Sequence, residues 1–113
     1  MDKLEQAKKN FEEGIKLFQK KNFKEAQIYF EKTLEIAPKS SPTLENLSKS
    51  YLETKDYDKA EKTLKYFISL NKEDDLIAYK LLYEIFTKLN KYSELVNCTL
   101  FLTYTKKIFF LIN

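Results

Sequence analysis

Histidine and arginine are absent from this chain of 113 residues, and glycine and cysteine occur only once each. Without histidine, the chain lacks the usual general base and the commonest metal ligand. Without arginine, it lacks the side chain that binds phosphate with two parallel hydrogen bonds. It also has no glycine-rich loop that could surround a phosphate group. We therefore expect no cofactor and no metal, and we do not expect an enzyme from this chain alone.

The scarcity of cysteine, proline and glycine also restricts the fold. The single cysteine, Cys98, excludes an intramolecular disulfide and has no histidine partner, which predicts an inert thiol. One glycine and two prolines leave little material for tight turns, whereas Leu, Glu, Lys and Ala favour helices. No apolar run approaches the ~20 residues that span a bilayer, and the first residues lack the apolar stretch of a signal peptide. We expect an all-α protein in the cytoplasm, with no membrane partner.

The charge is balanced rather than strongly basic. The chain has 20 basic and 17 acidic residues and a net charge of +3, and every basic residue is a lysine. A nucleic-acid-binding domain usually carries a more basic surface with its charge on one face. The pattern favours a solvated helix surface over a nucleic-acid site, and RNA binding through the lysines is kept as the weakest alternative.

A short phrase occurs twice, as NFKEA at residues 22–26 and as DYDKA at residues 56–60. The two alanines, Ala26 and Ala60, lie 34 positions apart, and the same shift brings Gly14 onto Ser48. A further shift of 35 brings Ser48 onto Tyr83. We therefore predict a single domain with a flank at 1–6, repeats at 7–40 and 41–75, and a third repeat at 76–113.

Each repeat contains two stretches in which apolar residues recur every three or four positions, which is typical of two amphipathic helices. Asn22 and Asp56 are predicted to cap the second helices of the first two repeats. Ser41 is predicted to cap the helix that follows Pro38, and Asn90 to adopt a left-handed conformation in the third turn.

Small residues predict where the two helices of a repeat approach closely. A glycine inside a helix costs ~1 kcal/mol relative to alanine, and close packing against Ala26 is the simplest reason to tolerate Gly14. Ser48 is expected to face Ala60 in the same way. In the third repeat, the equivalent residues are Tyr83 and Leu95, so we expect its helix pair to be splayed or shifted and the repeat to be degenerate.

The pattern resembles the tetratricopeptide repeat family, whose units are helix–turn–helix pairs of 34 residues. The resemblance implies a right-handed α-solenoid of stacked antiparallel helix pairs, with six helices in three hairpins. Asn10 and Lys72 depart from the family pattern. The residues that carry the resemblance are Gly14, Leu17, Phe23, Ala26, Phe30, Leu34 and Pro38 in the first repeat, and Leu44, Leu47, Ser48, Tyr51, Tyr57, Ala60, Leu64 and Ile68 in the second.

The resemblance also implies a function. Such repeats usually bind a peptide or a partner helix in a concave groove lined by the first helix of each pair. We therefore expect a non-catalytic scaffold for protein–protein interaction. The groove residues would be Lys8, Phe11, Glu12, Ile15 and Phe18 from the first repeat, Glu45, Asn46, Lys49, Leu52 and Glu53 from the second, and Ile77, Lys80, Leu81, Glu84 and Lys88 from the third.

One subfamily binds the acidic tails of chaperones through a clamp of Lys, Asn and Arg. Of the clamp positions only Asn46 matches, because Phe11, Ile15, Ile77 and Leu81 occupy the others. The carboxylate clamp is therefore not present, and we expect a partly apolar protein segment as the partner. The alternative is that the apolar groove residues of the first repeat pack on the N-terminal residues or on a second copy.

The sequence ends in the apolar stretch IFFLIN at residues 108–113, whereas solenoids usually end in a helix with a polar outer face. The stretch indicates a part of a longer repeat protein, a homodimer through this tail, another partner, or a tail that folds back over the third repeat. The second functional hypothesis is therefore an accessory module of a larger protein, for example a transferase, whose catalytic domain is not in this chain.

Overall fold

The computed structural model describes residues 2–70, 75–91, 93–94, 96–97 and 100, and five helices lie within them. They are α1 (Lys3–Gln19), α2 (Phe23–Ile36), α3 (Ser41–Glu53), α4 (Tyr57–Leu70) and α5 (Asp75–Leu89). The described part contains no strand, which confirms the all-α prediction. The predicted sixth helix follows Asn90. The described residues at 93–94, 96–97 and 100 are helical there, and the rest of that segment lies outside the described residues, so the described part holds five helices rather than six.

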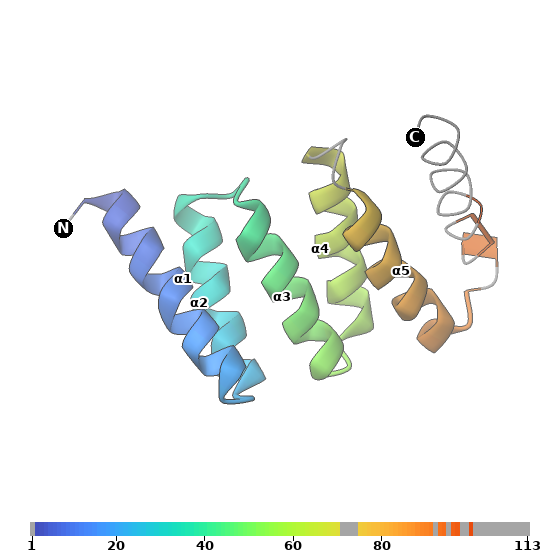
Figure 1. The fold of residues 1–113 in the computed structure, drawn as a ribbon, viewed down its shortest axis with the longest axis horizontal. Helices are drawn as coiled ribbons and strands as arrows, with labels where there is room; N and C mark the ends of the chain where they lie inside the picture. The colour runs from blue at the N-terminus through green and yellow to red at the C-terminus, as the bar shows by residue number, and fades with distance from the viewer. Residues whose placement is uncertain (1, 71–74, 92, 95, 98–99, 101–113) are drawn as a thin grey trace, which may run out of the picture.

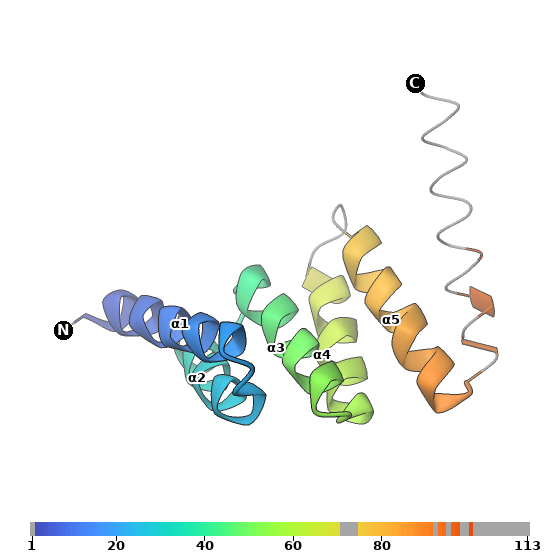
Figure 2. The same cartoon turned by 60° about the horizontal axis from the view of Figure 1, so that its bottom comes forward.

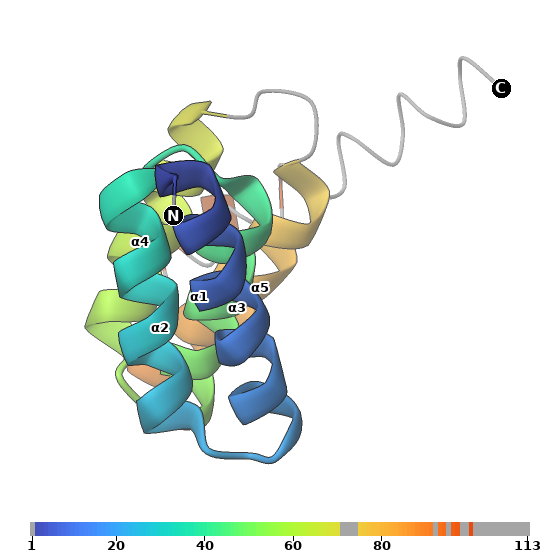
Figure 3. The same ribbon diagram turned by 90° about the vertical axis from the view of Figure 1, so that its left-hand side faces the viewer.

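The helices form a row of stacked antiparallel pairs (Figure 1). Along this row α1 packs on α2, α2 on α3, α3 on α4 and α4 on α5. Viewed from the end of the row, α1, α3 and α5 lie in one layer and α2 and α4 in the other (Figure 3). The axis of α1 is inclined to the axes of α3 and α5 (Figure 2). The chain is therefore an α-solenoid in which the first helices share one face.

The turns inside the three repeats have the same backbone geometry. Lys21, Lys55 and Asn90 have positive φ angles of 64°, 64° and 57°, which confirms the prediction for Asn90. A left-handed residue after a helix, with hydrogen bonds back to the last helical carbonyls, is a common helix ending. The equivalent N–H···O bonds join Asn22 to Leu17 at 2.8 Å, Asp56 to Tyr51 at 2.8 Å and Lys91 to Phe86 at 3.0 Å.

The core is one cluster that runs from α2 to α5. Its members recur at three- and four-residue spacing on each helix, as expected for amphipathic helices packed in layers. A fully buried Leu or Phe side chain contributes about 1.5–3 kcal/mol relative to an exposed one. The buried members are Ala26, Phe30, Leu44, Leu47, Tyr51, Ala60, Leu64, Phe67, Ala78, Leu82, Ile85 and Phe86.

Gly14 lies where α1 and α2 approach closely, as predicted, but its neighbour is not the one predicted. A Cβ atom built on Gly14 would lie 2.5 Å from Cε1 and 2.7 Å from Cδ1 of Phe30, and its three nearest atoms all belong to that ring. Phe30 has no exposed surface, so the ring has no free space to move into. The glycine is therefore needed for the Phe30 ring rather than for Ala26.

Three of the predicted caps need correction. The residue before α3 is Ser40, and Ser41 is already the first helical residue, with Pro42 in the first turn. Ser40 is extended, at φ −68° and ψ 104°, so it occupies the non-helical N-cap position. Asn22 precedes α2 as predicted, but its side chain makes no capping hydrogen bond. The Asp56 carboxylate instead accepts a hydrogen bond from the Thr54 hydroxyl at 2.9 Å.

Tyr83 is 43% exposed, so α5 turns this large residue away from its own core-facing side. Ile85, by contrast, is fully buried at the position that Ser50 holds in α3. Leu95, the predicted partner of Tyr83, lies outside the described residues, as do Cys98 and the apolar stretch at 108–113.

A neutral polar side chain joins the first repeat to the second. Gln27 of α2 is only 7% exposed, and its Nε2 donates hydrogen bonds to the Ser50 carbonyl at 3.1 Å and to the Thr54 hydroxyl at 3.0 Å. Nearby, the Tyr51 hydroxyl donates to Glu31 Oε1 at 2.6 Å. Burial and this hydrogen bond raise the pKa of Tyr51. We name this contact between α2 and α3 the first seam.

An ionised side chain holds the equivalent place between the second repeat and α5. The carboxylate of Glu61 lies 2.8 Å from both Lys65 Nζ and Lys91 Nζ. Burial alone would raise the pKa of the Glu61 carboxyl, but the hydrogen bonds from the two lysines outweigh it and lower the pKa. The hydrogen bond to Glu61 raises the pKa of Lys91. This contact between α4 and the turn after α5 is the second seam.

Candidate functional site

The predicted groove residues lie on α1, α3 and α5, the three helices that form one layer (Figure 3). None of them is buried. The most accessible are Lys8, Glu12, Glu53, Ile77, Lys80, Glu84 and Lys88, and the others are half-buried. The arrangement therefore brings these residues onto one accessible face.

At the α1 end of this face, the aromatic residues are held by the second helix of their own repeat. The Phe11 and Phe30 ring centroids lie 6.0 Å apart, and the Phe18 and Phe23 centroids 5.2 Å apart in an edge-to-face arrangement. These contacts leave Phe11 and Phe18 half-buried. A cavity of about 190 Å³ adjoins Phe11. It is lined by Ala7, Lys8, Phe11, Thr33, Ala37, Ser40, Pro42 and Thr43. This end of the face therefore carries apolar side chains that neighbouring rings already hold in place.

In the middle of the face, polar side chains of α3 form a hydrogen bond and an ion pair with other residues of α3. Asn46 Nδ2 donates a hydrogen bond to the Pro42 carbonyl at 2.8 Å, and Lys49 Nζ lies 3.8 Å from Glu45 Oε2. Asn46, the one match to the chaperone-tail clamp, is thus already engaged with a backbone carbonyl.

At the α5 end, apolar and charged side chains are exposed together. Ile77 is 51% exposed, and Leu81 is half-buried beside it on the same face. Lys80, Glu84 and Lys88 are exposed and form no ion pair within the described part of the chain. These charges are available to a partner.

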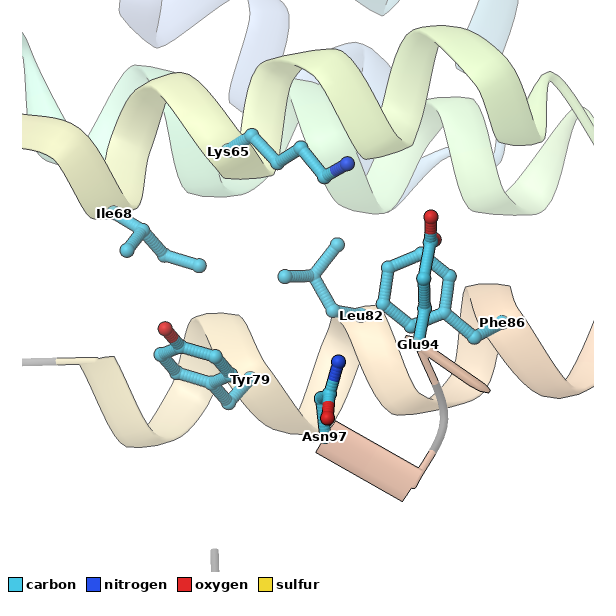
Figure 4. A pocket seen from close by; sticks show the side chains of 7 residues that line it. All are labelled: Lys65, Ile68, Tyr79, Leu82, Phe86, Glu94 and Asn97. Atoms are coloured by element: carbon cyan, nitrogen blue, oxygen red, sulfur yellow. The ribbon is translucent and has the colours of Figure 1, made fainter. Parts of the chain in front are cut away.

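Sequence reasoning missed two clefts that open between neighbouring repeats. The larger, of about 430 Å³, is shown in Figure 4 and is called the α4–α5 cleft. The other, of about 370 Å³, is called the α2–α4 cleft. The first is lined by Lys65, Ile68, Tyr79, Leu82, Phe86, Glu94 and Asn97, and the second by Leu34, Pro38, Leu44, Leu47, Lys62, Thr63 and Tyr66.

The residues that the structure describes include no group of three His, Cys, Asp or Glu side chains that could hold a metal ion. Among the helices in the described part, none is long and apolar enough to cross a membrane. The cytoplasmic location expected from the sequence stays a prediction.

Comparison with known proteins agrees with the arrangement of the helices. The family model described as tetratricopeptide repeat matches residues 17–84, which is more than half of the 113 residues. No curated protein matches the chain. The matched region extends from the end of α1 into α5 and so covers the first two turns, the first seam and most of the predicted groove residues. Repeats of this family generally mediate protein–protein interactions, and this chain belongs to the tetratricopeptide repeat family.

Proposed function

We propose that the chain is a non-catalytic scaffold that binds a segment of a partner protein on the face formed by α1, α3 and α5. The observation that carries this proposal is that all the predicted groove residues remain accessible on that one face. Apolar side chains lie at both ends of the face, on α1 and on α5, with polar groups of α3 between them. The partner segment would therefore be partly apolar.

The two ends of the face would contribute differently to binding. Phe11 and Phe18 are held by Phe30 and Phe23, so little side-chain freedom would be lost when a partner packs on them. The unpaired charges of α5 would act mainly on the rate of association and on orientation, because exposed charges steer encounters more than they add affinity.

The test uses two isoleucines of equal exposure on opposite layers. Ile77 on α5 and Ile28 on α2 are both 51% exposed. Replacing either of them should therefore affect the stability of the fold to a similar, small extent. A photo-crosslinking residue at Glu84 would first trap and identify the partner. The affinity of the partner would then be measured for Ile77→Asp and for the control Ile28→Asp.

We expect Ile77→Asp to weaken binding by about tenfold or more, because a charge would replace an apolar contact with the partner. Ile28→Asp should leave the affinity within about twofold, because it lies on the other layer. Equal affinity of the partner for wild type and Ile77→Asp would contradict binding in the groove. A loss of affinity in Ile28→Asp alone would place the site on the opposite face.

A further inference from the structure

Helix α1 carries a row of exposed and half-buried side chains along the face that it contributes to the groove. The row begins at Leu4, which is 75% exposed and lies one helical turn before the first predicted groove residue. None of the members is buried, so a partner can reach each of them. We call these residues the α1 row, and they are Leu4, Lys8, Phe11, Ile15 and Phe18.

The fold does not require apolar side chains in this row. The residues equivalent to Phe11 and Ile15 are charged in both later repeats. They are Glu45 and Lys49 in the second repeat and Lys80 and Glu84 in the third. Contacts with α2 hold Phe11 and Phe18, but Leu4 is too exposed to contribute to the core. An exposed apolar row that the fold does not need indicates an interaction surface.

The N-terminal residues that the structure describes do not cover the row. Leu4 itself belongs to α1, and Asp2 caps this helix by accepting a hydrogen bond from the Leu4 N–H at 2.6 Å. From Asp2 onward, the chain before Lys8 is therefore helix or cap, and it extends the row instead of folding over it.

The spacing of the row fits a helix better than an extended segment. Its members follow one another at intervals of four, three, four and three residues, which is the spacing found where two helices pack side by side. At a rise of about 1.5 Å per residue, the side chains recur about every 5 Å along α1. A partner helix repeats at the same interval, whereas the side chains on one face of an extended segment recur about every 7 Å. Only a helix keeps its match along the whole row, which is about 21 Å long.

Lys8 is the only charged member of the row. It is exposed between Leu4 and Phe11, and among the residues that the structure describes it forms no ion pair. Its nearest acidic neighbours along the helix, Glu5 and Glu12, are exposed beside the row and do not pair with it. A helix packed on the row would take water from the Lys8 ammonium, so it must supply an acidic group there.

This requirement selects a different protein over a second copy of the chain. The row contains no acidic residue. If two copies packed row against row, Lys8 would face an apolar side chain or another lysine in every register. Both arrangements are unfavourable, because the first leaves a charge without compensation and the second brings like charges together.

We propose that the α1 row docks an amphipathic helix of a partner protein. The helix lies along α1, its apolar residues pack on the apolar members of the row, and an Asp or Glu among them pairs with Lys8. This inference rests on the proposed function, because it names the conformation and the chemistry of the segment that the groove binds at its α1 end.

The test starts from random peptides long enough for about four helical turns, displayed on phage and selected on the full chain. Selected peptides should carry apolar residues at intervals of three and four, with an acidic residue among them. One such peptide is synthesised with a fluorescent label, together with a version that has a proline at its centre. We expect the proline version to bind at least about tenfold more weakly, because proline breaks a helix.

Two variants of the chain then locate the peptide. Leu4→Asn should weaken binding by about fivefold or more, whereas the control Ile28→Asn, an exposed apolar residue of the other layer, should change it by less than about twofold. Lys8→Glu should weaken binding by about tenfold, and replacing the acidic residue of the peptide with lysine should restore it.

Three outcomes would overturn the inference. The first is that selection gives no peptides, or only peptides without this pattern. The second is that the proline version binds as tightly as the parent peptide. The third is that Leu4→Asn binds as wild type does, or that the charge exchange at Lys8 restores nothing.

The partner trapped at Glu84 separates this inference from the proposed function. A loss of its affinity in Ile77→Asp, with none in Leu4→Asn or Lys8→Glu, would support the groove and overturn the helix on α1. A loss in Leu4→Asn and Lys8→Glu, with none in Ile77→Asp, would support the helix on α1 and contradict a site that extends to α5.

Discussion

The first two repeats fill the same space between their helices with different pairs of residues. In the first repeat, Gly14 faces the large Phe30 ring. In the second, the equivalent residues are Ser48 and Leu64, both fully or almost fully buried. The Ser48 hydroxyl donates to the Leu44 carbonyl at 2.8 Å, which satisfies it inside the core. A smaller residue on one helix is thus matched by a larger one on the other.

The seams that follow these repeats differ in charge rather than in size. Gln27 and Glu61 occupy equivalent positions and are 7% and 9% exposed. Gln27 binds neutral groups, whereas Glu61 binds two lysines. A neutral contact is insensitive to pH and salt, and an ion pair is sensitive to both. The same position of the repeat can therefore hold a neutral amide or an ionised carboxylate, provided that the residues facing it differ accordingly.

A second pair of equivalent positions shows the same change. Glu31 accepts a hydrogen bond from the Tyr51 hydroxyl in the first seam. In the second seam, the equivalent residues are Lys65 and Phe86, and the lysine ammonium lies 6.0 Å from the centre of the phenylalanine ring. An acid that accepts from a phenol is thus replaced by a cation near an aromatic face. Exchanging residues between the seams tests how far each depends on its own partners.

The largest effect is expected from Gln27→Glu, which places the residue of the second seam into the first. The carboxylate would face the Ser50 carbonyl and the Thr54 hydroxyl, neither of which carries a positive charge. An unpaired charge at such a buried position costs about 3 kcal/mol in the free energy of unfolding. Urea denaturation at neutral pH measures this loss.

The loss in Gln27→Glu should shrink as the pH falls, because the new carboxyl can then bind a proton and become neutral. The control is Glu25→Gln, an exposed carboxylate in the first turn of the same helix. A loss in Gln27→Glu that is equal at acidic and neutral pH would mean that shape, not charge, sets the first seam.

The second effect in size is expected from Gly14→Ser, which copies the second repeat into the first. The new Cβ would lie 2.5 Å from Phe30 Cε1, and overpacking of this kind costs about 1–3 kcal/mol. The double variant Gly14→Ser with Phe30→Leu reproduces the pair found in the second repeat. Thermal and urea denaturation should show a smaller loss for the double variant than the sum of the two single losses. Additive losses would show that the two positions are independent.

The repeat period, the helix pairs, the close approach at Gly14 and the left-handed Asn90 could be predicted from the sequence, because each depends on residues near one another in the chain. The left-handed Lys21 and Lys55 could not, since lysine has no preference for that conformation. The sequence also could not decide whether Ser40 or Ser41 occupies the N-cap position. Two adjacent serines have the same capping ability, and only the backbone path separates them.

The contacts between repeats were the least predictable part. Gln27 and Glu61 look like surface residues, because polar side chains are usually exposed and their partners in the next repeat lie 23 to 30 positions further along the chain. The two outer clefts were missed for the same reason, since each is lined by residues from at least three separate segments of the chain. The common layer of α1, α3 and α5 follows from the order of the helices, whereas the hydrogen bond of Asn46 to the Pro42 carbonyl depends on a rotamer.

A smaller effect is expected from Tyr51→Phe, which gives the first seam the aromatic residue of the second. The variant loses the 2.6 Å hydrogen bond to Glu31, a loss of about 1 kcal/mol because Glu31 is exposed and can be solvated. The pKa of Tyr51 is raised, so this stabilisation is complete below the ordinary value of 10.0 and declines as the pH rises above it. The difference in unfolding free energy from wild type should decline there too. A difference independent of pH would point to packing instead.

The smallest effect is expected from Glu61→Gln, which gives the second seam the residue of the first. The amide can still accept a hydrogen bond from Lys91, and both lysines are exposed enough to be solvated, so the loss at neutral pH should be below that of Tyr51→Phe. The lowered pKa of Glu61 means that its stabilisation is complete above the ordinary value of 4.5 and is lost as the pH falls through the lowered value. The raised pKa of Lys91 means that its stabilisation is complete below 10.5 and is lost as the pH rises through the raised value.

The difference between wild type and Glu61→Gln should therefore be greatest between these two limits and decrease outside them, and it should decrease with added salt. Urea denaturation across the pH range measures it, with Glu45→Gln as the control for a weaker pair at 3.8 Å on an exposed helix face. If Glu61→Gln changed stability equally at every pH, the second seam would depend on the shape of this side chain rather than on its charge. If it showed the expected window while Gln27→Glu was destabilising only when ionised, the two seams would be alternative solutions that cannot be exchanged one residue at a time.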